Sequence, residues 1–497
     1  MTTPAALVLA AGQGTRMKSK RPKVLHEVAG RPMVRHVVEA LRGAGIQRIV
    51  VVVGHGADGV RAALGDMNVE FAVQEEQLGT GHAVMQAEPL LAGHGGPVVV
   101  TCGDVPLLRP ETVAQLVETH VARGAAATVL SAMVDDPTGY GRVVRAQAPA
   151  AAEPGRLIRI VEHADASPEE RAIREVNSGT YCFDGGRLFE ALRAVRPDNA
   201  QGEYYLPDAV HVLAQGGGFV QAVIAPDADE ILGVNTRVEL ARAEAVYRRR
   251  IVEHWMLQGV TIVDPDTVYI DADVSLAPDV TVLPFTFIRG NTRIEEDCRI
   301  GPHADIADSV VERGAAVERA VVKGSRIGPG CAVGPYAYLR PGTVMEERAR
   351  VGSFVEVKKS RIGPESKVPH LSYVGDAVLG RDVNLGAGTI TCNWDGFNKY
   401  ETVIEDGARI GSNTNLIAPV RIGKGAFTGA GSSIAKDVPA DALAIERAEQ
   451  RNIEGWAVRR RQRAEAEKTA AGRAGAPGAG ADESPPADGP GGDKGTS

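Results

Sequence analysis

The chain has 497 residues, with 55 basic and 63 acidic side chains and a formal net charge of −8 at pH 7. This length exceeds one ordinary domain of about 100–200 residues, so two or more hydrophobic cores are expected. The acidic balance argues against a protein that binds nucleic acid without regard to sequence, and no nucleic-acid partner is expected. The 58 glycines and 29 prolines exceed their usual share of about 12%, which predicts that part of the chain is rich in turns.

The cysteines and the N-terminus predict a cytoplasmic protein. The five cysteines lie far apart and form no CxxC pair, which argues against a disulfide framework or a zinc site and favours reduced thiols. Residues 1–4 show no charged stretch followed by a long apolar one, so no signal peptide is expected, and no apolar run approaches the roughly 18 residues of a membrane helix. No membrane partner is therefore expected.

Residues 1–232 alternate short aliphatic runs with helical patterns. Ala5–Leu9, Ile49–Val53 and Pro97–Thr101 are predicted strands, and Pro32–Gly43 is a predicted helix. This alternation is typical of an α/β domain with a mostly parallel sheet covered by helices on both faces. Ligands of such sheets bind at the carboxyl ends of the strands, so functional residues are expected directly after these runs.

Residues 233–258 predict a single charged helix that links two bodies. Its predicted apolar stripe consists of Val234, Val238, Ala241, Ala245, Ile251 and Trp255. A helix of about 20 residues spans about 30 Å, so we expect a strut between the domains on either side.

Residues 259–456 repeat an aliphatic side chain every six positions, usually with glycine next to it. The longest register comprises Ile404, Ile410, Leu416, Ile422, Thr428 and Ile434. A period of six fits neither an α-helix nor a hairpin, but it fits a parallel β-helix in which each hexad forms one face of a coil. Residues 457–497 begin with a basic, helix-compatible stretch and continue with little apolar bulk, and they are predicted to be a disordered tail.

The first predicted strand leads into a loop suited to phosphate. Gly12 and Gly14 allow backbone N–H groups to approach an anion, and Arg16 and Lys23 add positive charge. Glycines after a strand are by themselves a weak signal, because an ordinary tight turn needs them too. The two cations favour a nucleotide.

The sequence of this loop resembles a known family. LAAGQGTRM at 9–17, followed by RPKVLH at 21–26, is similar to the signature of sugar-1-phosphate nucleotidyltransferases, which have a Rossmann-like α/β domain. Further motifs resemble bacterial bifunctional enzymes that are both N-acetylglucosamine-1-phosphate uridylyltransferases and glucosamine-1-phosphate N-acetyltransferases. These motifs are QLGTGHA at 77–83, GDVPL at 103–107, GYGR at 139–142, IVEHADAS at 160–167, NSGT at 177–180 and GVN at 233–235.

The resemblance implies roles for residues of the first domain. Those implied to bind the uridine nucleotide are Leu9, Ala11, Gly12, Lys23, Gln74, Gly79 and Thr80, and those implied to bind N-acetylglucosamine are Gly141, Glu162, Asn177 and Asn235. Asp104 and Asn235 are implied Mg²⁺ ligands, while Arg16 and Lys23 neutralise phosphates during catalysis. His26, His82 and His163 lie within these motifs but are expected to be structural.

Two segments of the repeat are interpreted as breaks in the hexad register. Val368–Tyr373 contains His370, and Thr391–Thr402 inserts a loop. Since a regular coil offers little chemistry, catalytic groups are expected at such breaks. The cationic residues just upstream of His370, which are Arg340, Lys358, Lys359 and Arg361, suggest an anionic substrate. The alternative is a solvated charged face beside a packed histidine.

The family resemblance favours the catalytic alternative in this half. It implies that His370 is the general base of acetyl transfer and that Arg340, Lys358, Tyr373 and Asn384 bind glucosamine-1-phosphate. The residues that it implies for acetyl-CoA are Ala387, Asn393, Trp394, Ser412, Ala430 and Arg447. The family usually has Tyr where this chain has Trp394, so an aromatic surface is kept and a hydroxyl is lost.

The resemblance also implies a left-handed β-helix and a homotrimer with acetyl-transfer sites between neighbouring chains. The overall reaction it implies is acetylation of glucosamine-1-phosphate by acetyl-CoA, followed by transfer of UMP from UTP to give UDP-N-acetylglucosamine and pyrophosphate. One alternative is a nucleotidyltransferase whose β-helix only regulates or oligomerises. The other is a non-enzymatic β-helix scaffold, which would show regular ranks of exposed Thr or similar residues.

Overall fold

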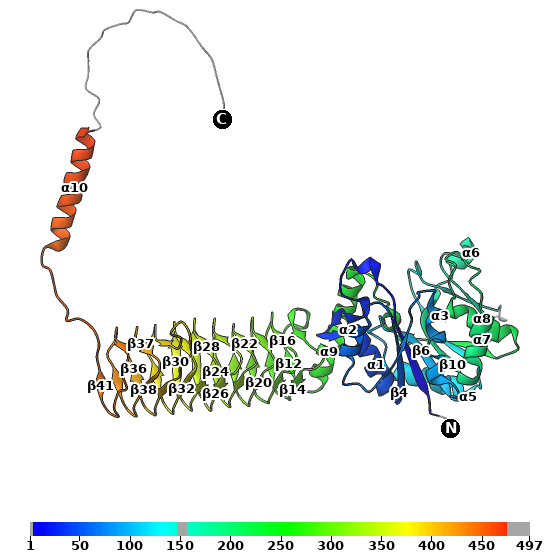
Figure 1. Ribbon diagram of the computed structural model, residues 1–497, viewed down its shortest axis with the longest axis horizontal. Helices are drawn as coiled ribbons and strands as arrows, with labels where there is room; N and C mark the ends of the chain where they lie inside the picture. The colour runs from blue at the N-terminus through cyan, green and yellow to red at the C-terminus, as the bar shows by residue number, and fades with distance from the viewer. Residues whose placement is uncertain (1–2, 147–156, 475–497) are drawn as a thin grey trace, which may run out of the picture. The chain divides into compact units, whose positions relative to one another are not determined.

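The computed structural model describes residues 3–146 and 157–474. The chain divides into two compact units, one up to Glu446 and the other from Arg447 onward. The first unit contains an α/β body and a coil of short strands, and the second contains one helix (Figure 1).

The α/β body is built on a mixed sheet with the strand order β11-β7-β10-β6-β1-β4-β5. These strands are Ala5–Ala10 (β1), Arg48–Val53 (β4), Glu70–Val73 (β5), Pro97–Cys102 (β6), Ala127–Met133 (β7), Glu175–Asp184 (β10) and Val220–Ile224 (β11). β1 pairs in parallel with β4 and β6, whereas β10 runs antiparallel to β6 and β7. Arg142–Arg145 (β8) and Leu157–Val161 (β9) form an antiparallel extension on β10.

Helices cover both faces of this sheet, as the sequence predicts. Alternate residues of β1 enter different cores: Ala5 and Leu7 join one cluster, and Val8 joins the other. The helices of this body are Met33–Gly43 (α1), Ala57–Ala63 (α2), Thr80–Met85 (α3), Glu88–Leu91 (α4), Pro110–Ala122 (α5), Pro168–Arg171 (α6), Gly185–Ala194 (α7) and Leu206–Gln215 (α8). The 3₁₀ turns are Thr15–Met17 (η1), Lys23–Leu25 (η2) and Ala228–Ile231 (η3). The minor hairpin pairs Glu27–Val28 (β2) with Arg31–Pro32 (β3).

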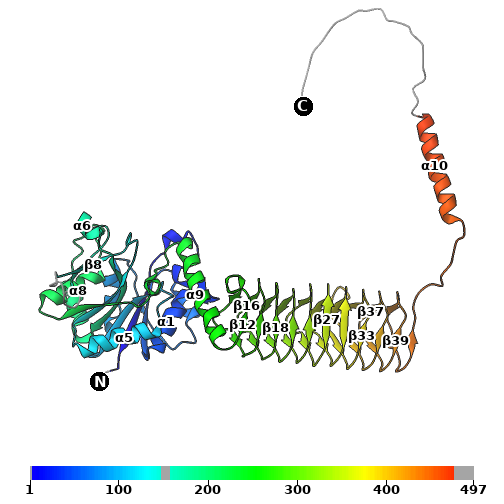
Figure 2. The same cartoon turned by 180° about the vertical axis from the view of Figure 1, so that it is seen from behind.

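Helix α9, Arg237–Leu257, packs against both bodies of the first unit (Figure 2). Its first half buries Ala243 against Met33 and Leu107 of the α/β body. Its second half buries Val252 in the core of the coil. The predicted apolar stripe is wrong for three of its positions, because Val238, Ala241 and Ala245 are exposed. A helix that meets two different bodies does not keep one buried face, so a single periodic stripe could not describe it.

The rest of the first unit is a left-handed parallel β-helix, as predicted. Its strands pair in parallel within three sheets of the described chain. The first sheet contains Thr261–Ile262 (β12), Thr281–Val282 (β15), Arg299–Ile300 (β18), Ala316–Val317 (β21), Ala332–Val333 (β24), Arg350–Ser353 (β27), Lys367–His370 (β30), Asn384–Leu385 (β33), Arg409–Ile410 (β36), Phe427–Thr428 (β39) and Leu443–Ala444 (β41).

The second and third sheets complete each triangular turn. The second contains Tyr269–Ile270 (β13), Phe287–Arg289 (β16), Asp305–Ala307 (β19), Val321–Lys323 (β22), Tyr338–Leu339 (β25), Glu356–Lys358 (β28), Tyr373–Gly375 (β31), Ile390–Cys392 (β34), Asn415–Ile417 (β37) and Ser433–Ile434 (β40). The third contains Ser275–Leu276 (β14), Arg293–Ile294 (β17), Val310–Val311 (β20), Arg326–Ile327 (β23), Val344–Met345 (β26), Arg361–Ile362 (β29), Ala377–Leu379 (β32), Thr402–Ile404 (β35) and Val420–Ile422 (β38). A 3₁₀ turn, Pro265–Thr267 (η4), lies in the first coil.

The hexad register predicts the interior of the coil correctly. All six residues of the longest register are buried. Thr428, the polar member, accepts a hydrogen bond from the Gly411 backbone N–H at 3.0 Å and lies 3.3 Å from the Thr414 hydroxyl. Its hydroxyl is therefore satisfied inside the coil, and the register tolerates it.

One of the two predicted register breaks is wrong. Val368 and Val374 are six residues apart and both are fully buried, so Val368–Tyr373 continues the coil instead of interrupting it. The predicted insertion is confirmed, because Thr391 and Ile404 are successive inward residues separated by 13 positions. The extra residues form a hairpin with a bridge between Trp394 and Lys399.

In the second unit, Trp456–Ala474 form helix α10. This helix covers the basic, helix-compatible stretch and the beginning of the segment predicted to be disordered. Residues 475–497, the remainder of that prediction, lie outside the described part of the chain.

Two buried histidines make the α/β body sensitive to acid. His36 on α1 hydrogen-bonds the Val28 carbonyl at 2.7 Å, and its Nδ1 is buried without a partner. Burial lowers the pKa of His36 to about 4, and burial also lowers the pKa of His120 to about 4. Between pH 4 and 6.5, these two histidines therefore bind a proton more readily in the unfolded chain than in the folded one.

We expect the free energy of unfolding of this body to fall as the pH drops from 6.5 to 4. Each such histidine contributes up to about 1.4 kcal/mol per pH unit in that window, because the unfolded state binds the extra proton. His36→Gln should reduce this slope, measured as the denaturation midpoint against pH. The same change at His55, an exposed histidine, should leave the slope unaltered, and equal slopes for all three proteins would contradict the assignment.

Candidate functional site

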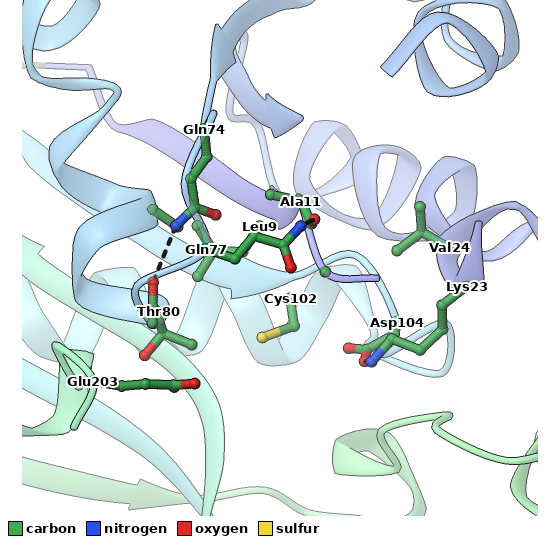
Figure 3. Close-up of a pocket in the computed structure, with 13 residues that line it drawn as sticks. Leu9, Ala11, Lys23, Val24, Gln74, Gln77, Thr80, Cys102, Asp104 and Glu203 are labelled. Carbon is green, nitrogen blue, oxygen red and sulfur yellow. Dashed lines mark hydrogen bonds and ion pairs between the residues drawn. The ribbon is translucent and has the colours of Figure 1, made fainter. Parts of the chain in front are cut away.

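A cavity of about 280 Å³ opens at the carboxyl ends of the central strands of the α/β sheet (Figure 3). All seven residues predicted to bind a nucleotide line it, together with Asp104, one of the two predicted metal ligands. The predicted nucleotide-binding residues are Leu9, Ala11, Gly12, Lys23, Gln74, Gly79 and Thr80. The structure therefore brings together residues that lie far apart in the sequence.

The ammonium of Lys23 lies between two oxygen ligands on one side of this cavity. It forms an ion pair with Asp104 and donates a hydrogen bond to Asn235 Oδ1 at 3.0 Å. Arg16 donates to the same Asn235 oxygen at 2.9 Å. The side chains of Lys23 and Asp104 are only 16% and 13% exposed, so these charges attract one another in a poorly solvated place.

Gly14 makes this position of Lys23 sterically possible. Its φ is +63°, and a Cβ at this residue would lie 2.6 Å from the Cβ of Lys23. In the structure, Gly14 thus serves the close packing of the loop, whereas the sequence interpretation gave it a role in approaching phosphate.

The beginning of α9 holds Asn235 in place. Thr236 is the N-cap, and its capping box with Glu239 fixes the first turn. Glu239 also accepts a hydrogen bond from the Asn235 backbone N–H at 2.7 Å. The Val234 N–H donates to the Asp104 carbonyl at 2.9 Å, which brings the two predicted metal ligands to the same edge of the sheet.

The opposite side of the cavity is shaped by the loop before α3. Gln74 donates to the Gly79 carbonyl at 3.3 Å, and Thr80 Oγ1 accepts from the Leu206 N–H at 3.0 Å. Gly79 has a φ of +108°, and a Cβ there would lie 2.7 Å from the Tyr204 carbonyl oxygen. Only glycine fits this contact between the loop and the segment that leads into α8.

Gln77, Cys102 and Glu203 also line the cavity, and the sequence interpretation did not assign them. Gln77 donates to the Ala11 carbonyl at 2.7 Å, which ties two walls of the cavity together. Its position in the motif QLGTGHA was an available signal. Burial raises the pKa of the Cys102 thiol to about 12, so this group stays protonated.

Three predicted sugar-binding residues, Gly141, Glu162 and Asn177, gather around the extension formed by β8, β9 and β10. The Asn177 N–H donates to the Gly141 carbonyl at 2.9 Å. Glu162 Oε1 lies 3.0 Å from the place where a Cβ of Gly141 would be, so a side chain there would crowd the carboxylate. Burial raises the pKa of Glu162, and Asp165 adds to this effect. Asn235, the fourth, lies with the cations described above.

The three motif histidines make contacts within the protein. His26 Nδ1 lies 3.1 Å from Arg237 Nη1, and His163 Nδ1 lies 3.2 Å from Arg142 Nη2. His82 lies between Gln74 and Gln86, at 3.1 Å from each. Each ring thus has a polar neighbour within the protein, and the structural roles expected for the three histidines stay a prediction.

In the β-helix, four predicted functional residues form a column along one corner. The strand pairings place His370, Ala387, Ser412 and Ala430 at equivalent positions of successive coils, at the end of β30 and after β33, β36 and β39. Backbone hydrogen bonds connect these corners, from Asn413 N–H to the Ala387 carbonyl and from Gly431 N–H to the Ser412 carbonyl. His370 is exposed at this corner.

A second group lies at the other end of the neighbouring face, which β25, β28, β31 and β34 form. The pairings place Arg340 and Lys358 on successive coils there, and Tyr373 begins β31 on the same face. Glu356 accepts a hydrogen bond from Arg340 at 2.9 Å and raises its pKa. Asn384, the fourth predicted sugar-phosphate residue, instead lies on β33 beside Lys367.

The inserted hairpin adds Lys399 to the second group. The ammonium of Lys358 lowers the pKa of Lys399 by hydrogen bonding and charge repulsion, which shows that two cations lie together. The sequence interpretation singled out this insertion but did not assign Lys399. Arg361, which was grouped with the cations near His370, lies on the third sheet and pairs with Glu346 at 2.5 Å.

The remaining residues predicted to contact acetyl-CoA lie in three places. Asn393 begins the hairpin and is buried, and it donates to Asp376 at 2.6 Å. Trp394 is 65% exposed on the same hairpin. Arg447 begins the second unit and is therefore described apart from the coil.

Comparison with known proteins identifies both halves of the chain. A MobA-like NTP transferase domain matches residues 6–173, and the bacterial transferase hexapeptide of six repeats matches residues 401–436. The protein called Bifunctional protein GlmU of Desulfitobacterium hafniense is 52% identical over 91% of this chain and 98% of its own length. Proteins of the same name from Heliobacterium modesticaldum and an Exiguobacterium species are each 54% identical, over 92% and 91% of this chain and 98% and 99% of their own lengths.

The chain belongs to the GlmU family. It is an enzyme with two activities, uridylyl transfer and acetyl transfer. The α/β body and the β-helix each bring together polar residues suited to one of them. Both alternatives, a transferase with one activity and a scaffold without activity, are therefore excluded.

Three further features of the described residues bear on ligands and surroundings. Within residues 3–146 and 157–474, no group of three or more His, Cys, Asp or Glu side chains is arranged to hold a metal ion. No helix in these ranges has the length and apolarity needed to cross a membrane. The thiols of all five cysteines are free.

We expect Gly79→Ala to lower uridylyl transfer at least tenfold, because the added methyl group would displace the Tyr204 backbone and deform the cavity. Acetyl transfer by the same protein should remain close to that of the wild type. Gly93→Ala is the matched control, since Gly93 also has a positive φ, of +77°, but has open space around it. Equal uridylyl transfer by both variants, measured as pyrophosphate release, would contradict this account.

Proposed function

We propose that residues 1–232 transfer UMP from UTP to N-acetylglucosamine-1-phosphate and that residues 259–456 acetylate glucosamine-1-phosphate with acetyl-CoA. Residues 233–258 would link the two parts. The observation that supports the proposal best is the presence of two cationic sites in different bodies, each beside residues suited to a different reaction. The acetylated product of the second site is a substrate of the first.

In the first site, a phosphate oxygen of the sugar attacks the α-phosphorus of UTP and pyrophosphate leaves. Both reactants are anionic, so catalysis depends mainly on holding them in line and neutralising charge. Lys23 and Arg16 supply positive charge beside Asp104. Gln74, Gly79 and Thr80 form the wall that holds the nucleotide.

The arrangement of Asp104 and Asn235 fits Mg²⁺. Both offer hard oxygen ligands, and a cation, Lys23, already bridges them. Mg²⁺ is usually held by one or two protein oxygens together with waters and substrate phosphates, so two protein ligands are enough. When bound, Mg²⁺ supplies a charge that stabilises the phosphate oxygens. The N-acetylglucosamine part of the acceptor is bound, in this proposal, by Gly141, Glu162, Asn177 and Asn235.

In the second site, His370 acts as the general base. It removes a proton from the glucosamine amine as the nitrogen attacks the thioester carbonyl carbon, and coenzyme A leaves as the thiol. A histidine suits this role at neutral pH. Its exposed position at a corner supports the role, because an amine can approach it.

The cationic group at the far end of the neighbouring face binds the sugar phosphate. Glucosamine-1-phosphate is held by Arg340, Lys358, Tyr373 and Asn384. Lys399 adds a second ammonium beside that of Lys358. Two adjacent ammonium groups repel each other, and a phosphate between them relieves that repulsion. The repulsion from Lys358 lowers the pKa of Lys399, and a bound anion would relieve it.

The column from His370 to Ala430 suits an extended cosubstrate. Its three steps between coils span roughly 14 Å, at about 4.8 Å per step. Acetyl-CoA is long and narrow, and it lies along Ala387, Ser412 and Ala430 in this proposal, with Asn393, Trp394 and Arg447 as further contacts.

We further propose a cytoplasmic homotrimer. The free thiols support a reducing compartment. Next to the corner column, successive coils expose apolar side chains, among them Tyr336, Phe354 and Leu371, which are 55%, 62% and 62% exposed. Phe354 and Leu371 have positive φ values of 57° and 47°. Bulky residues rarely adopt this conformation, and exposed rings on a strained backbone suit a contact with a second copy of the chain.

His370→Ala should lower acetyl transfer about 10²–10⁴-fold, because the general base is lost. Uridylyl transfer should stay close to that of the wild type, since His370 lies in the other body. The two half-reactions are measured separately on the purified chain. Normal acetyl transfer by this variant would show that another group is the base.

Lys23→Ala should give the opposite pattern. Removing the ammonium leaves the Asp104 carboxylate without its cation, and uridylyl transfer should fall at least about 100-fold. Acetyl transfer measured on the same preparation should be unaffected. Loss of both activities together would indicate a folding defect instead.

Phe354→Glu should weaken the trimer, because three carboxylates would replace three apolar rings at the proposed contact. Light scattering should show smaller assemblies, and acetyl transfer should fall while uridylyl transfer persists. Phe219→Glu, a change of an exposed ring in the α/β body, is the control and should leave the assembly intact. An unchanged assembly in both variants would exclude this corner as the interface.

A further inference from the structure

Asp376 lies where the inserted hairpin leaves and rejoins the coil. Its Oδ2 accepts a hydrogen bond from Asn393 Nδ2 at 2.6 Å, at the start of the hairpin. Its backbone carbonyl accepts from the Thr402 N–H at 3.1 Å, where the chain rejoins the coil. One residue thus connects both ends of the hairpin that carries Trp394 and Lys399.

The bond to Asn393 has a defined direction. A side-chain amide has a donor NH₂ group and an acceptor carbonyl, and a neutral neighbour could pair with either. An ionised carboxylate can only accept, so Asp376 binds the NH₂ group and turns the carbonyl Oδ1 away. Within the described residues, the side-chain hydrogen bond of Asn393 is the one that its NH₂ group donates to Asp376.

Cationic side chains lie close to Asp376. The ammonium of Lys359 lies 3.9 Å from Asp376 Oδ1. The charge of Asp376 also raises the pKa of Lys399, which opposes the lowering caused by Lys358. The Asp376 side chain is only 12% exposed, so water competes little for its bond to Asn393.

We propose that Asp376 is a positioning residue for acetyl transfer: it fixes the Asn393 amide so that its carbonyl oxygen accepts a hydrogen bond from a substrate N–H. This inference rests on the proposed function, because it takes Asn393 to lie in the acetyl-transfer site. The donor is the amine of the sugar or an amide of the coenzyme A arm, since both carry N–H groups. Asp376 itself touches neither substrate.

Exchange of the two side chains tests the direction of the bond. Asp376→Asn removes the preference for one orientation of the Asn393 amide, because the new amide pairs with Asn393 in either orientation. We therefore expect kcat/KM for acetyl transfer to fall about two- to tenfold. Asn393→Asp places two carboxylates 2.6 Å apart, and the loss should be larger than tenfold. In the double variant Asp376→Asn with Asn393→Asp, the new Asn donates to the new Asp, which keeps an acceptor oxygen for the substrate. We expect this variant to recover at least about tenfold over Asn393→Asp alone.

Asn suits position 376 because φ there is +47°, which Asn and Asp tolerate better than other residues with a side chain. Asp395→Asn is the matched control for charge. Asp395 lies on the same hairpin, but its carboxylate accepts from the N–H groups of Phe397 and Asn398 and not from Asn393. This control should keep the acetyl transfer of the wild type. Uridylyl transfer by every variant reports whether the chain is folded.

The separate KM values identify the donor. A higher KM for glucosamine-1-phosphate supports the sugar amine, and a higher KM for acetyl-CoA supports the coenzyme A arm. A double variant no more active than Asn393→Asp overturns the positioning role, provided that Asn393→Ala is impaired. Unimpaired Asn393→Ala instead overturns the place of Asn393 in the proposed site, and the inference with it.

Discussion

The burial of one side chain in every hexad is the constraint on which the second half of this protein depends. Each face of the coil turns one residue inward, and parallel pairing then aligns residues of successive coils at the same corner. Because the alignment follows from the pairing, residues 17 or more positions apart, such as His370 and Ala387, form a continuous column. The coil thus converts a sequence repeat into a surface long enough for an extended ligand.

The α/β body obtains its site differently. Its strands end at one edge of a sheet, and separate loops deliver Lys23, Asp104 and Asn235 to that edge. The three groups hold one another through charge and hydrogen bonds. Asn235 lies just before helix α9 and is held by its first turn, and Val252 near the end of the same helix is buried in the core of the coil, so one element contacts both the first site and the second body.

The two sites share a strategy for anionic substrates. In each, a lysine ammonium group lies beside a carboxylate of low exposure: Lys23 beside Asp104 in one body and Lys359 beside Asp376 in the other. The carboxylate lowers the cost of holding cations together before substrate binds, and it also fixes a neighbouring polar group. In the coil that neighbour is Asn393, whose orientation depends on a partner that accepts and cannot donate.

The sequence by itself determined the inward residues of the coil and three strands of the sheet, because short-range periodicity encodes them, and its family motifs pointed to residues that line the cavity of the α/β body. It failed at Val238 and at Val368–Tyr373, where burial depends on what packs against the chain. Only the tertiary structure decided that Lys399 meets Lys358, that Arg361 faces elsewhere and that Asp376 holds Asn393. These contacts join residues of different coils and of an inserted hairpin, and no local pattern in the sequence records which side chains such a hairpin brings together.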